Sequence, residues 1–149
     1  MKMKQAVLAV SLTVLSSAAW AGAPVNGLGQ AWPNATDQSL ATGFHAYSFS
    51  GAGGIHYIQI NDANGNVLAA VGAVAGQYIV LPMGRFSQLV STPQQQATSA
   101  ATPTASPTQV YNDGVTSVTA TPMSDGTLMM STSAVCDPIE CNSRGAQAQ

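Results

Sequence analysis

Short strand-like segments separated by tight turns fill the chain between residues 44 and 82. Segments 44–49, 55–60, 67–73 and 77–81 are rich in aromatic, β-branched or small apolar residues, and Gly, Asn, Asp or Pro stands in the stretches that follow them. Connections this short join antiparallel strands, because a parallel pair needs a crossover of a dozen or more residues. The pattern predicts a mainly β fold built on a small antiparallel meander of about four strands.

The connection at residues 61–66 (NDANGN) carries the strongest turn signal in this region. The Asp62 side chain can accept backbone N–H hydrogen bonds, and Gly65 can adopt a positive φ. We expect a type I turn followed by a glycine bulge, which would place the second and third segments side by side.

The first predicted hairpin contains both histidines of the chain. Pairing Phe49 with Ile55 across a glycine-rich loop would place His45 and His56 on opposite faces of the sheet. A slip of one residue would place the histidines on the same face, and one such register would bring them close enough to share a ligand. Only in that register could the two histidines share a metal ion, and further ligands would still be missing.

One face of the same hairpin carries three aromatic side chains. They are Tyr47, Phe49 and Tyr57. This face is either part of the core or a patch for a partner, because a thin sheet without a covering helix leaves one side open. Oligomerisation, or docking of the preceding segment with Trp32, would cover that side.

The remaining segments flank a small β domain that we place at residues 43–90. Residues 22–42 lack periodicity and are interpreted as an extended arm. Residues 91–109 consist only of Ser, Thr, Pro, Gln and Ala, so they bury too little apolar surface to offset their ordering entropy. We interpret them as a low-complexity linker, and exposed Ser and Thr in such a tract suit O-glycosylation. Residues 110–135 contain two strand-like segments around an Asp-Gly turn, which predicts an additional hairpin.

The N-terminus has the three parts of a secretory signal peptide. Lysines lie in residues 1–5, a mostly apolar stretch covers residues 6–15, and an A-x-A sequence ends at Ala21. The apolar stretch is too short to span a bilayer, which needs about 20 residues. We predict cleavage of residues 1–21 between Ala21 and Gly22, Sec-type export, and a bacterial protein that is periplasmic or secreted, with no membrane span after cleavage.

Cys136 and Cys141 are the only cysteines, and four residues lie between them in the C-terminal segment 136–149. In an oxidising compartment such a pair favours a structural disulfide. The neighbouring Asp137 and Glu140 disfavour the thiolate that redox chemistry needs. We predict a Cys-closed loop followed by a disordered tail.

The charge of the chain excludes several functions. Charged residues make up 7% of the sequence, and the chain without residues 1–21 has no lysine and two arginines against six acidic residues. Nucleic-acid binding needs a basic surface, and this sequence has too few lysines and arginines to form one. The sequence also lacks a G-x-S-x-G motif, and its two histidines have no cysteine nearby in sequence, so we predict no catalytic residues, no cofactor and no metal site.

Residues 55–85 contain the strings YIQIND and VLPMGR. In these strings the chain resembles a group of small exported bacterial proteins of unknown function, and the resemblance implies export but no activity. The sequence as a whole predicts a non-enzymatic β protein that binds a partner or has a structural role in the cell envelope. The alternative is an envelope enzyme or inhibitor that uses the hairpin with His45 and His56.

Overall fold

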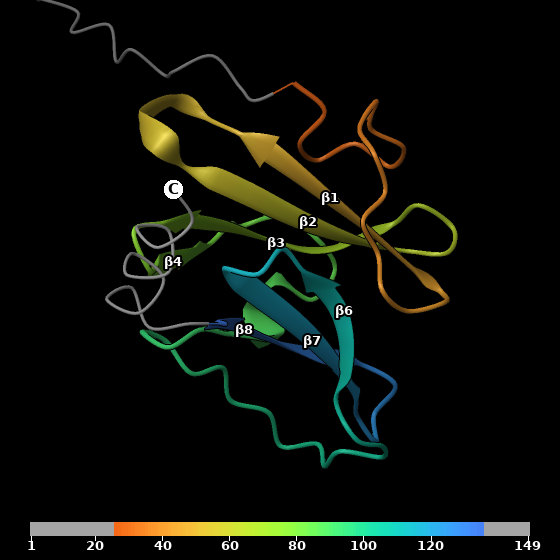
Figure 1. Ribbon diagram of the computed structural model, residues 1–149. Helices are drawn as coiled ribbons and strands as arrows, with labels where there is room; N and C mark the ends of the chain where they lie inside the picture. The colour runs from red at the N-terminus through yellow and green to blue at the C-terminus, as the bar shows by residue number, and fades with distance from the viewer. Residues whose placement is uncertain (1–25, 136–149) are drawn as a thin grey trace, which may run out of the picture.

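Two four-stranded β-sheets pack face to face in the computed structural model, which describes residues 26–135 (Figure 1). The only helices among these residues are two short 3-10 turns, η1 (Ala52–Gly54) and η2 (Ser87–Leu89). The mainly β fold predicted from the sequence is confirmed. None of the helices in this part of the chain is long and apolar enough to cross a membrane.

The first sheet is the predicted antiparallel meander, with its strands in the order β1-β2-β3-β4. Its strands are β1 (Phe44–Ser50), β2 (His56–Asp62), β3 (Val67–Val74) and β4 (Gln77–Val80). The predicted turn between β2 and β3 is present: Asp62 Oδ1 accepts the N–H groups of Asn64 and Asn66, and Gly65 has a φ of 82°. The pairing of β2 with β3 shifts between Ile60 and Asn61, at the end nearest this turn.

The register of the first hairpin differs from the prediction by two residues. Phe49 pairs with Tyr57 rather than with Ile55, and Ser50 pairs with His56. The loop keeps its expected length but begins one residue later, at Gly51 rather than at Ser50. It contains η1, and the Gly51 N–H closes it by donating to the carbonyl of Ile55 (2.7 Å). A shift of two residues keeps every side chain on its predicted face, because side chains alternate along a strand.

The second sheet contains the predicted C-terminal hairpin, and its strand order is β5-β8-β7-β6. Its strands are β5 (Val90–Ser91), β6 (Thr108–Asn112), β7 (Thr116–Pro122) and β8 (Leu128–Ala134). β7 and β8 are antiparallel, and the two-residue strand β5 pairs in parallel with β8. The hairpin therefore belongs to the same folded unit as the meander.

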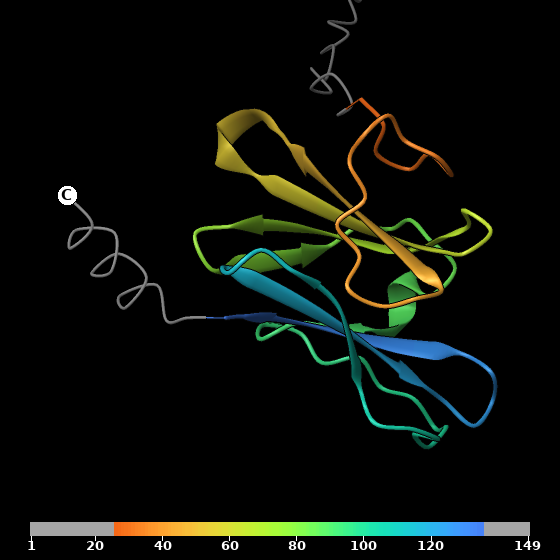
Figure 2. The ribbon, with the colours of Figure 1, turned by 45° about the vertical axis from the view of Figure 1, so that its right-hand side comes forward.

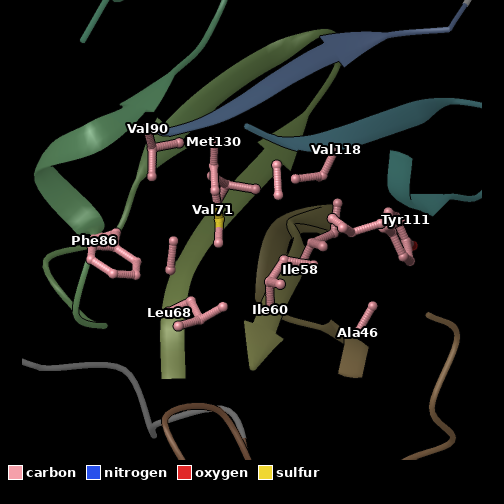
Figure 3. Packing of buried hydrophobic residues seen from close by; sticks show 13 residues of the cluster. Ala46, Ile58, Ile60, Leu68, Val71, Phe86, Val90, Tyr111, Val118 and Met130 are labelled. Carbon is pink, nitrogen blue, oxygen red and sulfur yellow. The ribbon is translucent and has the colours of Figure 1, made fainter. Parts of the chain in front are cut away.

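A single hydrophobic core fills the space between the two sheets (Figure 3). Ile58, Ile60 and Val71 from the meander face Val118 and Met130 from the second sheet, and all five side chains are buried. Both sheets bury their inward apolar side chains in this core, and this removal of apolar area from water is the main source of stability. Figure 2 shows the same two layers from a second direction.

Residues 92–107 connect β5 to β6, while residues 91, 108 and 109 of the expected linker belong to strands. The connection is largely exposed and its only pairing is a single bridge between Pro103 and Met123. Hydrogen bonds tie it to both sheets. Gln94 Oε1 accepts the Tyr78 N–H of β4 (3.2 Å), and the Thr104 N–H donates to the carbonyl of Pro122 in β7 (2.9 Å).

Candidate functional site

The N-terminal arm, residues 26–42, lies along the outward side of the meander and along its β1 edge (Figure 1). The outward side is the face predicted to carry the three aromatic residues. Its Tyr47 and Phe49 are 5% and 8% exposed. A Cβ atom at Gly27 would lie 3.0 Å from Cε1 of Phe49, so the arm packs directly on this ring. The chain therefore covers most of the predicted aromatic patch with its own arm.

Two amide side chains on the outward face hold the arm in place. Gln59 and Asn61 have no exposed surface. Gln59 Oε1 accepts the N–H of Gly29 (2.6 Å), and Gln59 Nε2 donates to the carbonyl of Gln30 (2.8 Å). Asn61 Nδ2 donates to the carbonyl of Ala31 (2.7 Å). These bonds satisfy backbone groups of the arm that would otherwise be buried without partners.

The next part of the arm covers the free edge of β1. The Gln38 N–H donates to the carbonyl of Ala46 (2.8 Å), and Asp37 Oδ1 accepts the Ala46 N–H (3.0 Å). Two residues further on, the Leu40 N–H donates to the carbonyl of Val110 in β6 (3.0 Å). The arm thus links the edges of the two sheets and removes an unpaired strand edge from solvent.

Asp37 also orients His45, one of the two predicted candidate histidines. Asp37 Oδ2 lies 2.6 Å from Nδ1 of His45, and Asp37 Oδ1 accepts the Ser39 N–H as well (2.9 Å). Partial burial raises the pKa of Asp37, but the hydrogen bonds from Ala46, His45 and Ser39 outweigh it and lower the pKa to about 2. The carboxylate is therefore a fixed negative charge beside the imidazole.

Trp32 completes an aromatic cluster around His45. The indole meets the imidazole edge to face, with ring centroids 5.1 Å apart and an interplanar angle of 70°. The Tyr47 ring lies nearly parallel to the His45 ring, at a centroid distance of 6.4 Å and an interplanar angle of 16°. A Cβ atom at Gly65 would lie only 2.6 Å from the indole, so Trp32 rests on the β2–β3 turn. Its side chain is nevertheless 57% exposed.

The second histidine lies elsewhere. His45 pairs with Asn61 and His56 pairs with Ser50, so the two imidazoles lie at opposite ends of the hairpin and on opposite faces. They do not form a common site. Among residues 26–135, no three His, Cys, Asp or Glu side chains gather into a group that could hold a metal ion.

The sequence did not single out Asp37, Gln59 or Asn61. One signal for the two amides was present: Gln59 and Asn61 alternate with Ile58 and Ile60, which places two amides on the same face as Tyr57. The predicted cleavage site at Ala21 and Gly22 and the predicted disulfide between Cys136 and Cys141 lie outside the described residues, and both stay predictions.

The cluster offers a rigid surface for recognition. An exposed indole provides a large apolar area at low cost in conformational entropy, and a carboxylate-bound imidazole provides a directed polar group. Comparison with known protein families, with curated proteins and with solved structures finds no match to this chain. The residues of the cluster are therefore the guide to its function.

Replacing Asn61 with Ala should release the arm. The carbonyl of Ala31 and the amide of Gln59 would lose a buried partner, which should lower the free energy of unfolding by about 2 kcal/mol. Urea unfolding measures this loss, and hydrogen exchange of residues 26–33 should become faster. The control is Asn64→Ala, at an exposed asparagine of the β2–β3 turn. Equal stability of the two variants would contradict the role of Asn61.

Asp37 should link stability to pH. Its pKa is about 2 in the folded protein against an ordinary value of 3.8, so its contribution is complete above the ordinary value and is lost as the pH falls towards 2. Asp37→Asn should cost about 1 kcal/mol at pH 7, since the group is partly exposed. Urea unfolding of both proteins at pH 7 and pH 2 should show this gap closing at the lower pH. A gap of the same size at both pH values would refute the linkage.

Proposed function

We propose that the protein is an exported, non-enzymatic binding module of the bacterial cell envelope, and that it recognises its partner through Trp32 and the residues beside it. The observation that carries this proposal is the exposure of Trp32. Five large apolar side chains of the described residues are strongly exposed, and Trp32 is the only aromatic one among them. Tryptophan is enriched at the energetic centres of protein interfaces.

The surroundings of Trp32 support binding. We define the arm surface as Trp32, Asp37, Leu40 and His45. The last three line an open hollow of about 380 Å³, and Leu40 is 56% exposed. An aromatic and an aliphatic anchor beside a carboxylate and an imidazole resemble the mixture found in protein interfaces, where an apolar centre has polar neighbours.

The residues of the arm surface are held in place before any partner binds, which favours specific binding. Trp32 is held by His45 and the β2–β3 turn, and Asp37 is held by backbone N–H groups of the arm and of β1. A surface that is ordered before binding loses less conformational entropy when a partner arrives. Export is supported by the signal-peptide pattern of residues 1–21. The alternative of an enzyme or inhibitor that uses both histidines together loses support, because they face opposite sides of the sheet.

In-cell photo-crosslinking tests this proposal. A photoreactive phenylalanine at Leu40 should form a crosslinked product in the exporting cell. The same probe at Ile79, which is equally exposed on β4, is the matched control and should not. Adding Trp32→Ala to the Leu40 probe should reduce the product at least about tenfold, as expected for a central interface residue. Urea unfolding of the Trp32→Ala variant shows whether the fold survives.

Two outcomes would overturn the proposal. One is a Leu40 crosslink that persists at full yield in the folded Trp32→Ala variant. The other is an equal yield from the Ile79 probe, since that result would mean contact without preference for the arm surface.

A further inference from the structure

A second hollow lies at the end of the sandwich remote from the β2–β3 turn. Its volume is about 270 Å³, and it is lined by the start of β2, the β3–β4 turn and the β6–β7 loop. A void in the core between the two sheets has a volume of only about 10 Å³. The two sheets thus separate at one end, and this opening is large enough for a small molecule.

The cavity is lined by polar side chains from both sheets and by a small number of apolar side chains. His56 comes from the first sheet, and Asp113 and Thr116 come from the second sheet and its β6–β7 loop. Thr116 Oγ1 lies 3.3 Å from the hydroxyl of Tyr78, and this buried contact links the sheets beside the cavity. Ala73, Val74 and Val115 supply the apolar part of the wall.

The carboxylate of Asp113 is held in one orientation. Its Oδ1 accepts the N–H groups of Val115 (2.8 Å) and Thr116 (2.6 Å), and its Oδ2 accepts the hydroxyl of Tyr111 (3.1 Å). A carboxylate fixed by three donors is already oriented for a ligand, so binding need not order it.

No lysine or arginine among the described residues neutralises this carboxylate. Arg85 is the only such residue in 26–135, and its backbone N–H donates to the carbonyl of Val67. Val67 begins β3, whereas Ala73 and Val74 of the cavity lie at the other end of that strand, about 20 Å away by strand rise. The cavity therefore has a negative charge that a cationic ligand can pair with.

The β3–β4 turn forms part of the cavity rim. Ala75 has a φ of 48° and is the only non-glycine residue in 26–135 with a positive φ. With Gly76 it makes the two-residue turn between β3 and β4, and both line the cavity. A two-residue hairpin turn commonly takes a positive φ at both positions, so this geometry fixes the shape of one side of the rim.

We propose that this cavity binds a compact organic cation, a primary ammonium group attached to a short apolar chain. The ammonium group pairs with Asp113, and the apolar chain packs against Val74 and Val115. The volume is slightly below the range of drug-sized ligand sites, which restricts the ligand to a few carbon atoms. This site is separate from the arm surface, so its failure leaves the proposed function unaffected.

NMR titration of the full exported chain with n-butylammonium tests the proposal. The backbone amides of Gly54, Gly76 and Val115 should shift with saturation, while n-butanol and butyrate at the same concentrations should bind at least about tenfold more weakly because they lack the positive charge. Absence of saturable shifts with n-butylammonium would overturn the proposal. Equal binding of n-butanol would also overturn it, because the charge would then have no role.

Two variants with matched controls locate the site. Val115→Trp should fill the opening and abolish binding, whereas Ile79→Trp, at an equally exposed position on β4, should leave it unchanged. Asp113→Asn should weaken binding about tenfold or more, and Asp125→Asn in the β7–β8 turn should not. If Asp113→Asn fails to fold, the Val115→Trp variant decides, since Val115 is 59% exposed and its side chain is not needed for the core. If the Val115→Trp variant bound n-butylammonium as tightly as the unchanged protein, the proposed site would be refuted.

Discussion

The packing of the N-terminal arm on the outward face of the first sheet depends on two buried amide side chains. Gln59 and Asn61 lie on the face of the meander that points away from the core, where the neighbouring side chains are aromatic. An arm of backbone can cover such a face only if its own N–H and C=O groups find partners there. The two amides supply both donors and acceptors. The arm can therefore bury Tyr47 and Phe49 without leaving backbone groups unsatisfied.

The chain also covers the outer edges of its first sheet by hydrogen bonds from its own segments rather than with lysine. Many β proteins place lysine on exposed edges to prevent pairing with other chains, but residues 26–135 contain no lysine. Here the arm pairs with Ala46 of β1, and the side chain of Gln94 binds Tyr78 of β4. The segment that covers β1 also positions Asp37 beside His45. The arm surface is thus a direct consequence of how this edge is covered.

Local patterns predicted the meander, its turn at Asp62 and the C-terminal hairpin, because turn residues and alternation act over a few positions. The strand β5 was not predicted, since two residues carry no periodicity and their partner in β8 is distant in sequence. The register of the first hairpin was wrong by two residues because its loop begins one residue later than expected, and a glycine-rich segment does not fix where a strand ends. The pairing of Asp37 with His45, and the placement of His56 and Asp113 around one cavity, depend on tertiary structure that no sequence spacing encodes.

The most direct test of this account is to remove the arm's first half. A chain that begins at residue 34 should be compared with one that begins at residue 22 by urea unfolding and sedimentation velocity. The shorter chain should lose at least about 2 kcal/mol of stability and self-associate, because Tyr47 and Phe49 become exposed and Gln59 and Asn61 lose their partners. Equal stability and equal sedimentation of the two chains would contradict the central role of the arm.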